Sequence, residues 1–77
     1  MPIDQDVVEE IGRRALAELE SRPMSVGLLE KRLSEDLRLR RDLIHPAILG
    51  IISHGDAEIV GWGVTLKITA QGRQAVR

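Results

Sequence analysis

Three arginines lie within four consecutive residues near the middle of the chain, at Arg38, Arg40 and Arg41. Guanidinium groups donate paired hydrogen bonds to phosphate oxygens, so a cluster of this kind predicts contacts with a phosphate-bearing polymer. A solvated turn in which nearby carboxylates pair with the arginines explains the pattern equally well, and both interpretations stay open. The nearby carboxylates belong to Glu35, Asp36 and Asp42.

The two histidines, His45 and His54, raise the question of metal binding or general-base catalysis. A zinc site needs three or four converging ligands, and the chain has neither a cysteine nor an HxxxH spacing. The sequence also shows no nucleophile beside a base, no glycine-rich phosphate loop and no evident catalytic pair of carboxylates, since the acidic residues are spread over solvent faces. We therefore predict no catalytic residue, no metal ligand and no cofactor, and expect a protein that is not an enzyme.

The composition of the 77 residues, with 43% hydrophobic and 30% charged side chains, predicts one small domain over residues 1–77. No apolar run approaches the roughly 18 residues that span a membrane. No signal peptide is evident either, so we expect a cytoplasmic protein without membrane contact. Because so short a chain lies near the lower size limit for independent folding, we also expect a homodimer or another protein partner to add stability.

The formal net charge of −1 is unevenly distributed along the chain. Residues 1–20 contain six acidic and two basic residues, a net −4, whereas residues 21–77 contain six acidic and nine basic residues, a net +3. A compact domain with this division can present a positive face to a polyanion. The division permits DNA binding without requiring it.

Apolar residues at helical spacing predict three helices in the first two thirds of the chain. The first ends before Pro23, because the residue before a proline is disfavoured in a helix. Ser25 is a good N-cap for the second. Asp42 can cap a third helix, which holds Pro46 in its first turn and ends before Gly55.

Residues 57–69 alternate apolar and polar side chains with the period of two that is typical of an antiparallel strand pair. A two-residue turn at 62–63 places Ile59 opposite Leu66, both on the core side. A three-residue turn would set apolar residues against polar ones, so the two-residue turn is favoured. The same register pairs Glu58 with Lys67 on the solvent side and Ala57 with Ile68 on the core side.

The predicted order of elements, with a short last helix over residues 70–76, resembles that of a winged helix-turn-helix domain. Residues 68–73 (ITAQGR) resemble the LTxxGR ending of the wing in regulators of the PadR and MarR type. Residues 23–25 (PMS) and 51–59 (IISHGDAEI) fit the same pattern. The resemblance covers nearly the whole chain and implies an α+β fold with three helices, a two- or three-stranded antiparallel β-wing and a short C-terminal helix.

The resemblance also implies that the third helix enters the major groove of double-stranded DNA, while the wing contacts the flanking backbone or the minor groove. Base edges are read mainly by Arg, Lys, Asn and Gln, and the third helix as predicted contains none of them. Most of the expected contacts are therefore to phosphates. The candidate DNA-binding residues are Arg38, Arg40, Arg41, His45, Ser53, Lys67 and Arg73.

The third helix is more apolar than one core face requires. Either one or two of these side chains are exposed or covered by another subunit, or a small core without Phe needs all of them, which is the interpretation that we favour. The apolar residues are Ile44, Ile48, Leu49, Ile51 and Ile52.

Trp62, the only aromatic residue, lies between two glycines. It can fold back over the sheet, anchor a protein partner or dimer mate, or pack against DNA, and the first two interpretations are favoured. The resemblance and the arginines together predict a small DNA-binding protein that acts as a transcriptional regulator. The alternative is a winged-helix module for protein interaction or assembly that does not bind DNA sequence-specifically.

Overall fold

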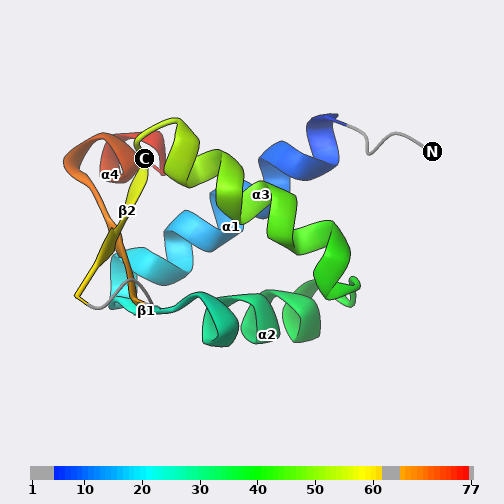
Figure 1. Cartoon of the computed structure of the whole chain (residues 1–77). Coiled ribbons are helices and arrows are strands. Elements are labelled where there is room, and N and C mark those ends of the chain that lie inside the picture. Colours follow the sequence, from blue (N-terminus) through cyan, green and yellow to red (C-terminus); the bar gives the residue numbers. More distant parts are fainter. Residues whose placement is uncertain (1–4, 62–64, 77) are drawn as a thin grey trace.

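The computed structural model describes residues 5–61 and 65–76, and these residues form four helices and three short strands. The α+β class expected from the sequence is confirmed. Figure 1 shows α3 lying across α1, with the sheet and α4 at the opposite end of the molecule from the turn between α2 and α3. The elements are α1 (Gln5–Ser21), β1 (Met24–Ser25), α2 (Val26–Leu37), α3 (Arg41–Ser53), β2 (Ala57–Val60), β3 (Thr65–Ile68) and α4 (Ala70–Ala75).

One apolar stripe of α1 faces the core. Ile11, Ala15 and Leu19, each four residues apart, are at most 1% exposed, as expected for the inward side of an amphipathic helix. The helix ends at Ser21, two residues before Pro23, so the predicted stop is confirmed. α1 thus provides the surface on which α3 packs.

The start of α2 is also confirmed. The Ser25 hydroxyl accepts a hydrogen bond from the backbone N–H of Leu28 at 3.1 Å, and this amide would otherwise have no partner in the first turn. Leu29 and Leu33, one turn apart, are buried. The cap determines where α2 starts, and the two leucines determine which face turns inward.

Two expectations about the first turn of α3 are wrong, because the helix begins two residues earlier than predicted. Arg40 occupies the N-cap position without a side-chain hydrogen bond, and Arg41 is the first helical residue. The backbone N–H of Leu43 already bonds to the Arg40 carbonyl at 3.0 Å. Asp42 is therefore not the cap but lies in the first turn, and Pro46 lies inside the helix.

The sheet has the strand order β1-β3-β2 with both pairings antiparallel. The predicted register is confirmed, since Ile59 pairs with Leu66 and Glu58 with Lys67. β1 adds Met24 on the other side of Leu66. The extended segment before α2 is therefore a third strand.

Ile59, which we expected in the core, is 49% exposed. It ends a row across the sheet in which Met24 is 4% and Leu66 0% exposed. β2 is an edge strand, and α1 packs mainly against the central strand β3. The predicted strand register is therefore confirmed, but the prediction that Ile59 lies in the core is wrong, because the helices do not cover the sheet as far as Ile59.

The motif at residues 68–73 ties α4 to the turn that follows α3. The Thr69 hydroxyl is the N-cap of α4: it accepts a hydrogen bond from the Gly72 N–H at 3.1 Å and donates one to the Gly55 carbonyl at 2.7 Å. The Gln71 side-chain amide donates to the His54 carbonyl at 2.7 Å. The motif therefore holds the fold together at this end.

The core within the described residues consists of aliphatic side chains and Met24, without a buried polar side chain. No helix in residues 5–61 and 65–76 is both long and apolar enough to cross a bilayer. Trp62 and the turn that we predicted at 62–63 lie outside the described residues.

Candidate nucleic-acid interface

The turn between α2 and α3 is short and is closed by hydrogen bonds to Ser34. Arg38, the C-cap of α2, has a φ of 55° and donates its backbone N–H to the Ser34 carbonyl. The Leu39 N–H shares that carbonyl at 3.3 Å, and the Ser34 hydroxyl donates to the Leu39 carbonyl at 2.6 Å. Because Leu39 also packs against the core, the backbone that carries the arginines is well fixed.

All three arginines of the turn are exposed. Arg40 Nε lies 3.2 Å from Asp42 Oδ1, an ion pair whose side chains are 83% and 63% exposed and which is therefore weak in water. Arg38 and Arg41 form no ion pair within the described part of the chain. The sequence left open whether nearby carboxylates pair with the arginines of the turn. Within the described residues only Arg40 has such a partner.

The side of α3 away from the core carries six exposed residues, which we call the outer face of α3. The buried residues Ile44, Ala47, Ile48 and Ile51 occupy the positions i, i+3, i+4 and i+7, which is all that one core contact requires. The outer face consists of Arg41, Asp42, His45, Pro46, Leu49 and Ser53.

Leu49, at the middle of this face, is 52% exposed. The interpretation that the core needs every apolar residue of the helix is therefore wrong for Leu49, while Ile52 is half-buried against the core. The early start of α3 also adds a basic residue to the helix, because Arg41 lies in its first turn, one turn before His45. The helix has one guanidinium group, at its N-terminal end.

His45 is held by Glu30 of α2. The imidazole Nδ1 lies 2.6 Å from Glu30 Oε1, whose side chain is only 15% exposed, whereas that of His45 is 53% exposed. The contact fixes the ring from one nitrogen and leaves Nε2 for another partner. No local pattern in the sequence indicates this contact between α2 and α3, which joins residues 15 positions apart.

Lys67 and Arg73 form a second basic group, separate from the turn. Both are exposed, and they line one surface hollow together with Glu58 and Thr69. Figure 1 shows β3 and α4, which carry them, at the opposite end of the molecule from the α2–α3 turn. The predicted binding residues therefore fall into two groups at the two ends of α3.

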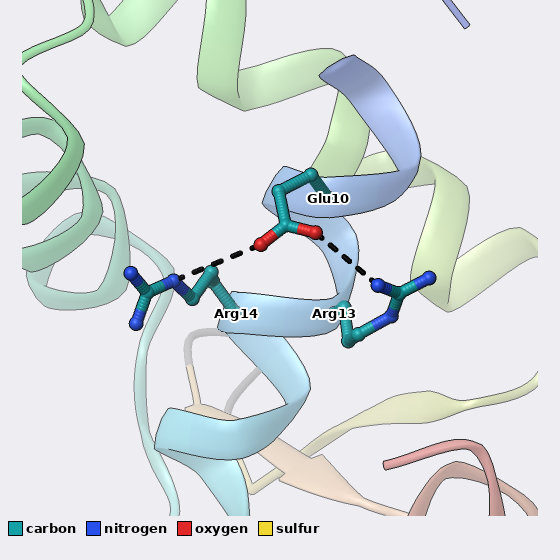
Figure 2. A network of polar contacts seen from close by, with 3 residues as sticks. All are labelled: Glu10, Arg13 and Arg14. Atoms are coloured by element: carbon teal, nitrogen blue, oxygen red, sulfur yellow. Dashed lines mark hydrogen bonds and ion pairs between the residues drawn. The ribbon is translucent and has the colours of Figure 1, made fainter. Parts of the chain in front are cut away.

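The arginines of α1 are paired on their own helix. Glu10 Oε2 lies 3.2 Å from Arg13 Nη1, and Oε1 lies 4.0 Å from Arg14 Nε. Figure 2 shows the Glu10 carboxylate between the two guanidinium groups. Both arginines thus contact a carboxylate of their own helix.

Among the residues that the structure describes, no three His, Asp or Glu side chains are grouped so that they could hold a metal ion. No family model, curated protein or solved structure matches the chain. The function must therefore be inferred from the geometry of the surface. The suggested contact of Trp62 with a partner stays a prediction, since that residue is outside the described range.

Proposed function

We propose that this chain is a winged helix-turn-helix protein that binds double-stranded DNA and acts as a transcriptional regulator. In this proposal α2 and α3 form the helix-turn-helix, and β2 and β3 form the wing. The N-terminal end of α3 approaches the major groove, while Arg38 and Arg40 of the turn contact the phosphates beside it. Lys67 and Arg73 contact the backbone at the wing.

The observation that carries the proposal is the hydrogen-bonded turn with exposed arginines beside the N-terminal end of α3. Arg38 adopts the left-handed conformation, which costs a residue with a side chain roughly 1–2 kcal/mol relative to glycine. A glycine at this C-cap would avoid that cost. A functional role for the positive charge of Arg38 would offset this cost. Phosphate binding is such a role, and the neighbouring charges of Arg40 and Arg41 are consistent with it.

The test is the salt dependence of binding to a labelled DNA duplex, measured by fluorescence anisotropy. Each phosphate contact contributes about −0.9 to the slope of log K against log salt concentration. Arg38→Gly, which preserves the turn while removing the charge, should make the slope less negative by about 0.9, and so should Arg41→Ala. Arg14→Ala is the matched control, because Arg14 is exposed but lies on α1, and it should leave the slope unchanged.

Absence of binding to any duplex at low salt would overturn the proposal. Equal losses for Arg14→Ala and Arg41→Ala would also contradict it, because they would indicate a general charge effect.

A second candidate is a protein-interaction or assembly module. The exposed Leu49 in the middle of the outer face of α3 favours it, since large apolar side chains are enriched where proteins meet. Sedimentation velocity distinguishes the two candidates. A module that assembles through α3 should self-associate without DNA and become monomeric on Leu49→Glu, whereas a DNA-binding domain should keep its sedimentation coefficient on that change.

A further inference from the structure

We propose that the outer face of α3 recognises the 5-methyl group of a pyrimidine base in the major groove, with Leu49 as the contacting residue. This inference rests on the proposed function and names the DNA chemistry that the helix selects. The major groove offers hydrogen-bonding groups on every base pair, but its main apolar group is the methyl of thymine. 5-Methylcytosine carries the same methyl group at the same position.

The composition of the outer face leads to this inference. From Asp42 to Ser53 the helix has no arginine, lysine, asparagine or glutamine, the side chains that read most base edges through hydrogen bonds. Leu49 is 52% exposed and lies one turn after His45 and one turn before Ser53. A helix placed in the groove by the arginines at its N-terminal end would therefore present an isobutyl group where other helices present an amide or a guanidinium group.

Leu49 is free to serve this purpose because the core does not need it. Its neighbour Ile48 is 0% exposed and completes the inward side of α3. Beside a base edge without a methyl group, Leu49 would displace water from donors and acceptors without replacing their hydrogen bonds, which is unfavourable. Beside a methyl group it would remove apolar surface from water on both partners, which is favourable.

The surroundings of Leu49 are complementary to DNA rather than to another apolar surface. Arg41 lies at the N-terminal end of the same face, next to Arg38 and Arg40. The second basic group, on β3 and α4, lies toward the other end of α3 (Figure 1). A leucine that shares a helix face with Arg41, beside Arg38 and Arg40, matches a groove whose floor carries methyl groups and whose walls are phosphates. The one carboxylate of this face, Asp42, is paired with Arg40.

His45 adds one hydrogen-bonding position beside the methyl contact. Because Glu30 engages its Nδ1 at 2.6 Å, the ring is held with Nε2 available one turn before Leu49. This arrangement lets one base edge be read by a hydrogen bond and a nearby base by apolar contact. The expected target is therefore a short step that combines a methylated pyrimidine with a hydrogen-bonding edge.

The experiment compares four duplexes of equal length by anisotropy: alternating dA-dT, alternating dA-dU, alternating dG-dC, and alternating dG with 5-methyl-dC. Uracil pairs like thymine but lacks the methyl group. We expect the dA-dT duplex to bind more tightly than the dA-dU duplex by about three- to fivefold for each methyl group contacted. A similar gain of the 5-methyl-dC duplex over dG-dC would show that the methyl group itself is read, and a gain confined to dA-dT would assign the contact to thymine.

The variant Leu49→Ala should remove the preference for methylated duplexes while leaving the salt slope unchanged. Leu28→Ala is the matched control, since Leu28 is an exposed leucine on α2, 39% exposed, and it should leave the preference intact. Unfolding curves of both variants would verify that they are folded.

Binding of all four duplexes without a methyl preference overturns the inference and leaves the proposed function standing. A preference that survives Leu49→Ala also overturns it. Absence of binding to every duplex overturns both, and loss of self-association on Leu49→Ala in that case would assign the face to a second copy of the chain.

Discussion

Gly72 determines how closely α4 approaches the turn after α3. A Cβ atom at this position would overlap the carbonyl oxygen of Asp56 and would lie 2.8 Å from Ile68 Cγ1. The Asp56 carbonyl also accepts a hydrogen bond from the Thr69 N–H at 3.0 Å, so it is held in place. Moving it to make room for a methyl group would disturb that bond.

Replacing Gly72 by Ala should lower the free energy of unfolding by about 1–3 kcal/mol, the typical cost of overpacking. Urea denaturation followed by circular dichroism measures the change. Gly50→Ala is the matched control, because a Cβ at Gly50 has nothing within 4 Å. Alanine is favoured over glycine inside a helix by about 1 kcal/mol, so the control should be neutral or stabilising. Equal stability of Gly72→Ala and the wild type would contradict the account of this contact.

At the scale of single residues, the sequence pointed to some residues of the candidate surface and missed others. Arg38, Arg40 and Arg41 were found from their type and spacing, and their exposure agrees with the expectation. Glu30 was not found, because its contact with His45, 15 residues later, depends on how α2 and α3 cross. The exposure of Leu49 was likewise not predicted, because the identity of a leucine does not indicate whether it lies on the buried or the exposed side of a helix.

At the scale of elements, period and capping chemistry predicted most of the fold. The strand register follows from the alternation of side chains, and only one register keeps Leu66 and Ile68 inward. The start of α3 could not be predicted from capping preference, because Arg40 makes no side-chain cap and the bonds at Ser34 close the turn instead. The exposure of Ile59 depends on how far α1 extends over the sheet, which no local pattern records.

The attachment of α4 to the rest of the molecule can be tested at Thr69. Thr69→Val keeps the shape of the side chain but removes the hydroxyl that bonds both Gly72 and Gly55. We expect the free energy of unfolding to fall by about 1–2 kcal/mol, as is typical of a lost N-cap. Thermal unfolding gives the measurement, and Thr69→Ser, which retains the hydroxyl, should stay close to the wild type. A Thr69→Val protein as stable as the wild type would show that the two hydrogen bonds do not hold α4.

At the scale of the whole molecule, stability depends on a small core. The chain extends over 34 × 23 × 19 Å, and a domain of this size buries a smaller share of its surface than larger ones do. No buried polar network supplements the aliphatic packing within the described residues. The loss of a single core side chain is therefore expected to remove a large fraction of the free energy of unfolding.

Two neighbouring residues of α3 test this dependence. Ile48 is 0% and Leu49 52% exposed. Ile48→Ala should cost about 2–5 kcal/mol, a large fraction of the roughly 5–15 kcal/mol by which domains are stable. Leu49→Ala should change stability by less than about 0.5 kcal/mol, because the side chain is largely in water. Urea titrations of the two variants give the comparison, and similar losses for both would show that Leu49 is covered in solution.

The aliphatic core has an optical consequence. The chain contains no Phe and no Tyr, and Trp62 is its one aromatic residue. Nothing in the described core absorbs or emits in the near ultraviolet, so intrinsic fluorescence originates from a single position, two residues beyond the end of β2. A change in emission on adding a duplex or a protein therefore reports on the segment of the chain between β2 and β3, without any label and without background from the described core.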